Sequence, residues 1–180
     1  MRQSGWQAAA TGVATLGSVL IRPAVLGDAG ALRSIYNVEV ETSTATFDLV
    51  ARSLEEQQRW ITDRSGAHVA LVADLDGTVA GFGSLSPYKE RPAYATSVED
   101  SVYVHRDHHG RGLGRALLGE LVATADLHGF HAIIARIVGD HDASIGLHRS
   151  AGFEQVGRER EVGRKFGRWL DVVIMERVLS

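Results

Sequence analysis

The most constraining feature of this sequence is a strand-like run that ends in a glycine-rich turn and continues into an amphipathic helix. Residues 98–105 are rich in β-formers, and apolar residues recur at helical spacing at Leu117, Leu118, Leu121, Val122 and Ala125. The turn between these segments contains Gly110, Gly112 and Gly114. Glycines let backbone amides approach a ligand closely, and the first N–H groups of a helix carry the positive end of its dipole. We therefore expect a phosphate or diphosphate to bind here.

Several ligands are compatible with such a turn. The P-loop spacing Gly-x-x-x-x-Gly-Lys-Ser/Thr is absent, and the dinucleotide pattern fits Gly110 and Gly112 but meets Arg115 where its third glycine belongs. Arg111 and Arg115 can add charge-assisted hydrogen bonds to a phosphate. The alternative is that the glycines only form a turn and both arginines lie in solvent.

The rest of the sequence predicts a mixed α/β fold. The expected strands cover residues 18–22, 68–74, 78–86, 98–105, 131–138, 153–157 and 169–179, and the expected helices cover 28–40, 53–61, 117–125 and 142–150. Asp28 and Ser53 are candidate helix N-caps, and Asp76-Gly77 is a hairpin signal. Only the late strand–helix–strand unit requires parallel pairing. We expect one domain over residues 18–180, preceded by a loosely ordered extension at residues 1–17.

Composition removes several function classes. The chain of 180 residues has no cysteine, so a disulfide scaffold, a zinc ribbon and a catalytic thiol are excluded. A formal net charge of -3 gives no reason to expect nucleic acid as a partner. No run approaches the roughly 18 apolar residues of a membrane span. Histidines cluster at His105, His108 and His109 without an acidic or thiol partner at a recognised spacing, so we expect no metal site. A reducing cytoplasm suits the chain.

Two motifs resemble those of the GCN5-related N-acetyltransferases (GNAT family). The segment from His109 to Gly114 is similar to the family's coenzyme A motif, Gln/Arg-x-x-Gly-x-Gly/Ala. Residues 144–153, which end in Gly-Phe, resemble its second signature helix. Three further segments, 41–47, 99–104 and 165–169, resemble the phosphinothricin and methionine sulfone/sulfoximine acetyltransferase group within that family.

The resemblance implies a mixed, mostly antiparallel sheet that splays between the fourth and fifth strands, with acetyl-CoA in the gap. It assigns the cofactor to the strand residues Val102, Tyr103 and Val104, to the turn residues His109, Gly110, Arg111, Gly112, Leu113, Gly114 and Arg115, and to His141 and Ser144. Backbone groups of Val102 and Val104 would pair with the pantetheine. His109 and His141 depart from the family pattern, which has Gln or Arg at the first position and commonly Asn at the second.

Two side chains are candidates for proton transfer. An amine must be neutral to attack a thioester, and the resemblance places a general base at Glu99. The coenzyme A thiolate needs a proton as it leaves, and His148 stands where the resembling group has a histidine. The alternatives are a surface carboxylate at Glu99 and a packed helix histidine at His148. Because the chain has no cysteine, direct attack in a ternary complex is the expected route.

The sequence says less about the amine that accepts the acetyl group than about acetyl-CoA, which donates it. Arg91 can bind an amino-acid carboxylate bidentately, and the resemblance adds Phe47, Lys89 and Tyr94 as pocket candidates. Lys165 and Trp169 are expected to close the site, from this chain or from the partner subunit of a homodimer. A polyamine, an aminoglycoside or a protein N-terminus remains an alternative acceptor. A non-catalytic coenzyme A-binding module is the alternative from another class.

Overall fold

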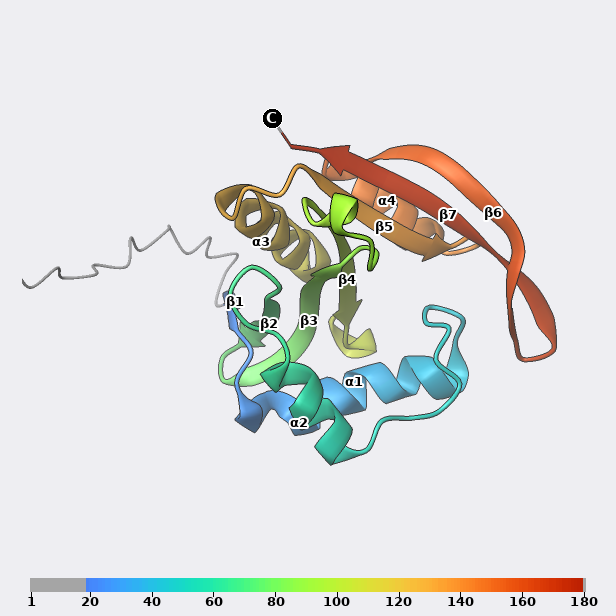
Figure 1. Cartoon of the computed structure of the whole chain (residues 1–180). Coiled ribbons are helices and arrows are strands. Elements are labelled where there is room, and N and C mark those ends of the chain that lie inside the picture. Colours follow the sequence, from blue (N-terminus) through green and yellow to red (C-terminus); the bar gives the residue numbers. More distant parts are fainter. Residues whose placement is uncertain (1–18, 180) are drawn as a thin grey trace, which may run out of the picture.

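The computed structural model describes residues 19–179, so the extension expected at residues 1–17 lies outside the described range. The helices are α1 (Ala29–Thr42), α2 (Leu54–Thr62), α3 (Leu113–Leu127) and α4 (Asp142–Ser150), with short 3₁₀ turns η1 (Leu26–Asp28), η2 (Pro92–Tyr94) and η3 (Arg106–His108). The strands are β1 (Val19–Pro23), β2 (Ala70–Leu75), β3 (Thr78–Pro87), β4 (Ser97–Val104), β5 (Ala132–Val138), β6 (Glu154–Lys165) and β7 (Arg168–Val178). Figure 1 shows their arrangement.

Within the described residues, the strands form one sheet in the order β1-β2-β3-β4-β5-β7-β6. Neighbouring strands are antiparallel except for β4 and β5, which are parallel. This pair is joined only from Ser97↔Ala132 to Glu99↔Ile134, although β4 runs on to Val104 and β5 to Val138. The two strands therefore diverge after Glu99, and the predicted splay between the fourth and fifth strands is confirmed.

Helices cover both faces of the sheet. On one face, α1 and α2 bury Leu32, Ile35 and Ile61 against β2 and β3. On the other face, the apolar stripe predicted from the sequence is buried: Leu117, Leu118, Leu121, Val122 and Ala125. At roughly 1.5–3 kcal/mol for each fully buried large aliphatic side chain, this stripe fixes α3 firmly on the sheet.

Helix α3 lies close to β3 because two strand residues there have no side chain. A Cβ at Gly83 would lie 2.9 Å from Leu121 Cδ1, and one at Gly81 would lie 3.4 Å from Leu117 Cδ1, both atoms of α3. The first distance is well inside van der Waals contact and the second is at its limit. The small residues of β3 therefore set the position of α3, and with it the position of the glycine turn at the helix start.

Both predicted N-cap residues stand at the start of a helix, but only Ser53 caps its helix with its side chain. Ser53 accepts from the Glu56 N–H at 3.1 Å while Glu56 accepts from the Ser53 N–H at 2.7 Å, a complete capping box. Asp28 is the N-cap residue of α1, as predicted, but its side chain makes no capping hydrogen bond: the carboxylate accepts from the Val25 N–H and pairs with Arg22 at 2.7 Å. The hydrogen bond from Arg22 holds the Asp28 carboxylate toward the residues before α1 and lowers its pKa.

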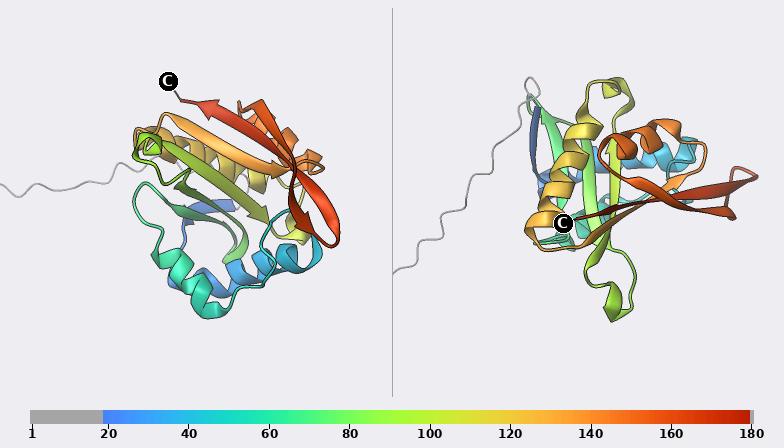
Figure 2. Two further views of the ribbon diagram at one scale, coloured as in Figure 1. Left: turned by 45° about the vertical axis from the view of Figure 1, so that its right-hand side comes forward. Right: turned by 90° about the horizontal axis from the view of Figure 1, so that it is seen from above.

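The β6 strand is longer than the sequence predicts. It runs to Lys165 rather than ending near Gly157, and most of its side chains are exposed. The alternating charges of residues 158–161 contain no apolar period, so the strand exists because β7 pairs with it and not because one face is buried. The β6–β7 hairpin extends past the body of the sheet (Figure 2). None of the described helices is long and apolar enough to span a bilayer.

Candidate active site

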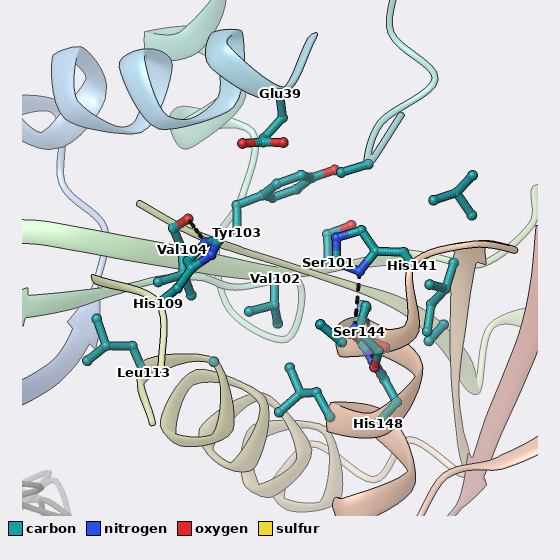
Figure 3. A pocket seen from close by; sticks show the side chains of 18 of the residues that line it. Glu39, Ser101, Val102, Tyr103, Val104, His109, Leu113, His141, Ser144 and His148 are labelled. Atoms are coloured by element: carbon teal, nitrogen blue, oxygen red, sulfur yellow. Dashed lines mark hydrogen bonds and ion pairs between the residues drawn. The ribbon is translucent and has the colours of Figure 1, made fainter. Parts of the chain in front are cut away.

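A cleft of about 550 Å³ opens where β4 and β5 diverge. This main cleft is lined by Asp100–Val104 of β4, the glycine turn, Ala135–Val138 of β5, and His141 with one face of α4 that includes Ser144 and His148 (Figure 3). Val102 and Tyr103 are among the lining residues, as are Leu113 and Ser144. The structure thus gathers most of the predicted cofactor residues around one cavity.

The turn that begins α3 has the geometry of an anion site. Gly110 and Gly112 have φ values of 76° and 79°, which is the left-handed region that glycine adopts without strain. Gly112 is the N-cap residue and provides no side-chain cap, so the first N–H groups of α3 have no side-chain acceptor at that position. Leu113 and Gly114 line the main cleft at this helix start. These amides fit a diphosphate group, the part of acetyl-CoA that the sequence placed here.

The two arginines of the turn are placed differently. Arg111 and Arg115 are exposed and are not part of the lining of the main cleft. Their predicted contact with the diphosphate stays a prediction. On the described chain, it is the backbone of the turn rather than these side chains that faces the cavity.

The two histidines that depart from the family pattern have structural partners. His109 Nε2 lies 2.9 Å from the Val104 carbonyl oxygen and ties the turn to the end of β4. His141 is the N-cap of α4, where its Nδ1 accepts from the Ser144 N–H at 3.1 Å. Both rings line the main cleft (Figure 3). Each histidine therefore orders the wall of the cavity, whatever it contributes to a ligand.

A buried ion pair forms part of the lining of the main cleft. His148 Nε2 is 3.0 Å from Asp100 Oδ2, and the two side chains are only 5% and 1% exposed. His148 Nδ1 is 2.8 Å from the Ser144 carbonyl oxygen, which can only accept, so this nitrogen carries a proton. Burial alone would lower the pKa of His148, but the hydrogen bond and charge of Asp100 outweigh it and raise the pKa. Asp100 therefore favours the protonated form of the His148 ring.

A second hollow of about 370 Å³ adjoins the main cleft. It is lined by the loop Thr44–Phe47 and by Glu99, Ser101 and Tyr103, which alternate along one face of β4. The two cavities share Ala45, Ser101, Tyr103, Arg136 and Val138. Burial raises the pKa of the Glu99 carboxyl, and the positive charge of Arg136 opposes that rise. A carboxylate with a raised pKa therefore stands beside a cavity that opens onto the cleft.

Four predicted acceptor residues lie outside both cavities. Lys89, Arg91 and Tyr94 belong to the exposed segment around η2, which projects from the sheet (Figure 2), and the Lys89 ammonium stands 4.5 Å from the centre of the Tyr88 ring. Trp169 is 61% exposed on the β6–β7 hairpin. Phe47 alone among the predicted acceptor residues lines the second hollow.

Lys165 reaches the second hollow indirectly. It is 4% exposed, and its ammonium donates to the carbonyl oxygen of Thr46 at 2.8 Å. Burial lowers the pKa of this ammonium. Gly163, two residues earlier on β6, packs so closely against the Phe47 ring that a Cβ there would overlap it. The hairpin therefore clamps the loop that forms one wall of the second hollow, and Lys165 acts on that wall instead of lining it.

Two residues of the site were not found from the sequence. Asp100 follows Glu99 and points to the opposite face of β4, where an acid must have a partner, but nothing local identifies His148 as that partner 48 residues away. Arg136 is a charged residue in the middle of an otherwise buried strand. That contrast was the available signal, because a buried strand tolerates an arginine only where it reaches solvent or a cavity. Among the described residues, no group of three His, Asp or Glu side chains could hold a metal ion.

Comparisons with known proteins agree with this geometry. Residues 21–174 match the model of the acetyltransferase (GNAT) domain. The chain is 38% identical to the L-methionine sulfoximine/L-methionine sulfone acetyltransferase of Pseudomonas aeruginosa, over 88% of this chain and 94% of that protein. It is 41% identical to the phosphinothricin N-acetyltransferase of Streptomyces coelicolor, over 89% and 96%.

A solved structure extends the likeness to three dimensions. The phosphinothricin acetyltransferase of Sinorhizobium meliloti, crystallised in complex with AcCoA, superposes with a TM-score of 0.87 at 37% identity, covering 91% of this chain and 89% of that one. The family match covers most of the chain. The protein belongs to the GNAT acetyltransferase family, and it is an N-acetyltransferase by class.

Proposed function

We propose that this protein transfers the acetyl group of acetyl-CoA to the amine of a small, amino-acid-like acceptor of the methionine sulfone, methionine sulfoximine or phosphinothricin type. The observation that carries the proposal is the junction of the two cavities along β4, with Glu99 on one side and His148 on the other. The curated relatives act on acceptors of this type by name, at 36–41% identity over most of the chain.

The residues support direct transfer within a ternary complex. Amides at the start of α3 hold the diphosphate and direct the thioester along the main cleft. Glu99 accepts a proton from the acceptor ammonium, and its raised pKa brings it nearer to the operating pH of a general base. The freed amine attacks the thioester carbonyl carbon, its nitrogen loses a second proton to solvent, and the C–S bond breaks. The departing thiolate then takes up a proton, and His148, which lines the main cleft, is the candidate donor. With no cysteine in the chain, no acyl-thiol enzyme intermediate is needed or available.

The test is a thiol-release assay with acetyl-CoA and a panel of amines. The panel contains methionine sulfone, methionine sulfoximine and phosphinothricin, with spermidine, an aminoglycoside and a short peptide as alternative acceptors. We expect turnover on the amino-acid analogues. Coenzyme A binding without release of thiol on any amine would instead support a binding module.

Glu99→Gln tests the base. We expect kcat at neutral pH to fall by roughly 10²–10⁴-fold, the usual contribution of a general base. Glu154→Gln is the matched control, since Glu154 is an exposed glutamate on β6 that lines neither cavity. Unchanged kinetics in Glu99→Gln would remove that residue from the mechanism.

We also propose that the chain acts as a homodimer in the cytoplasm. Large apolar side chains on the β6–β7 hairpin, Val162, Phe166 and Trp169, are 54–61% exposed in the single chain, which suits burial against another subunit. Sedimentation of the purified protein measures the oligomeric state, and a monomer at micromolar concentration would rule the dimer out.

A further inference from the structure

A chain of two hydroxyls and one carboxylate runs from the second hollow to the protein surface. The Tyr36 hydroxyl lies 2.8 Å from Thr46 Oγ1 and donates to Asp48 Oδ2 at 2.7 Å. Tyr36 and Thr46 both line the hollow, and they are only 5% and 8% exposed. The Asp48 side chain is 50% exposed. The chain therefore begins at buried oxygens in the wall of the hollow and ends at a carboxylate in contact with solvent.

The carboxylate fixes the direction of these hydrogen bonds. An ionised Asp48 can only accept, so the Tyr36 O–H points to it. The Tyr36 oxygen must then accept from the Thr46 O–H, since a phenol has no second proton to donate. Each O–H of the chain thus points away from the hollow and toward Asp48. This polarity suits the passage of a proton from the hollow to the surface.

Thr46 can accept a proton that arrives from the hollow. A hydroxyl oxygen has two lone pairs, and the Asp48 N–H uses one of those on Thr46 at 3.2 Å. Tyr103 also lines the hollow; burial raises the pKa of its hydroxyl, and hydrogen bonding with Thr46 opposes that rise. A proton can therefore enter the chain at Thr46 directly or through the neighbouring phenol of Tyr103.

The segment that carries the chain is held from two sides. Lys165 donates to the Thr46 carbonyl oxygen at 2.8 Å. The Arg52 guanidinium lies 3.8 Å from the centre of the Tyr36 ring, and its Nη2 lies 3.5 Å from Asp48 Oδ2. These contacts fix the three oxygen-bearing groups relative to one another, and proton transfer along a chain requires that fixed geometry.

We infer that the second proton of the attacking nitrogen leaves the hollow through this relay, from Thr46 through Tyr36 to Asp48. The inference rests on the proposed function, in which Glu99 takes the first proton and the nitrogen must lose another. As that N–H bond breaks, Thr46 accepts the proton and passes its own to Tyr36, which passes its own to Asp48. Asp48 then releases a proton to water, and rotation of the two hydroxyls restores the starting polarity.

Tyr36→Phe tests the relay, because it removes the hydroxyl and keeps the ring on which Arg52 stacks. The measurement is the rate of acetyl transfer in a single turnover, with the fastest acceptor of the amine panel. We expect this rate to fall by roughly 10²-fold, the lower end of the contribution of a positioned proton acceptor. Added imidazole should restore part of the rate in the variant and leave the wild type unchanged, because a small diffusing base can take the proton instead.

Thr46 supplies an independent pair of variants. Thr46→Val removes the hydroxyl at nearly the same volume, whereas Thr46→Ser keeps it. We expect slow transfer with imidazole rescue in Thr46→Val and a rate near that of the wild type in Thr46→Ser. Thr62→Val is the matched control, because the Thr62 hydroxyl donates to a carbonyl oxygen on the exposed side of α2 and lines neither cavity. Equal rates in Thr46→Val and Thr46→Ser would overturn the relay.

The outcomes separate the relay from the function on which it rests. If the wild type acetylates an amine and Tyr36→Phe transfers at the same rate, the relay is wrong and the acetyltransferase stands. Slow transfer in Tyr36→Phe that imidazole does not restore assigns the hydroxyl to packing of the loop and also overturns the relay. If the wild type binds coenzyme A and releases no thiol with any amine, the proposed function fails and the relay fails with it.

Discussion

Replacing His148 by leucine tests the buried ion pair that His148 and Asp100 form in the lining of the main cleft. The substitution leaves the Asp100 carboxylate 1% exposed and without its partner at Oδ2, while Oδ1 is already unpaired. Removing one member of a buried pair costs about 3–5 kcal/mol, because the other charge stays in a medium of low polarity. With a urea m-value of about 2 kcal/mol/M, the unfolding midpoint should fall by roughly 2 M at pH 6.

The pH dependence follows from the direction of the pKa shift. The folded pKa of His148 is raised above its unfolded value of about 6.5. The pair therefore contributes its full stability below pH 6.5 and loses it as the pH rises through the folded pKa. We expect the gap in unfolding free energy between the wild type and His148→Leu to be larger at pH 6 than at pH 9.

A double substitution supplies the control. Replacing both partners by apolar residues, Asp100→Val with His148→Leu, leaves no buried charge and should recover most of the lost stability. The measurement is urea unfolding followed by circular dichroism at both pH values. Two results would refute this reasoning. One is a double variant whose loss of unfolding free energy equals the sum of the losses in His148→Leu and Asp100→Val. The other is a difference in unfolding free energy between the wild type and His148→Leu that is the same at pH 6 and pH 9.

Three further substitutions test the walls of the two cavities. Gly112→Ala forces a left-handed φ on a residue with a Cβ, so we expect a loss of about 1–2 kcal/mol and weaker coenzyme A binding by calorimetry; Gly119→Ala, in open space within α3, should leave that affinity unchanged. Gly163→Ala displaces the Phe47 ring and should raise the acceptor KM with little change for acetyl-CoA, and an unchanged acceptor KM would contradict this packing. Lys165→Met removes the donor to a buried loop carbonyl and should cost about 1–3 kcal/mol in urea unfolding, whereas an unchanged midpoint would refute the clamp.

Local patterns in the sequence were enough to predict most of the helices and strands and part of the proposed site. The glycine spacing and the apolar face of α3 predicted the diphosphate turn, and alternation along β4 placed Glu99 on the face with Ser101 and Tyr103. The motif likeness added His148. In each case the information lies within about fifteen consecutive residues, where dihedral preference and periodicity act directly.

Motif likeness was less informative about the acceptor. Lys89 and Tyr94 were predicted by likeness and Arg91 by its chemistry, yet all three lie outside the cavities of a single chain. Arg136 and Asp100 belong to no motif, and each becomes visible as a site residue only through what the fold brings beside it.

By itself, the sequence determined the order of strands and helices, the glycine turn at the start of α3 and the absence of thiol chemistry, because these depend on residue types and short spacings. The tertiary structure decided where β4 and β5 separate, which acid pairs with His148, and which cation lines the second hollow together with Glu99. Those features depend on pairings between residues far apart in the chain, which are settled by the packing of the whole sheet between its helices and not by any local preference.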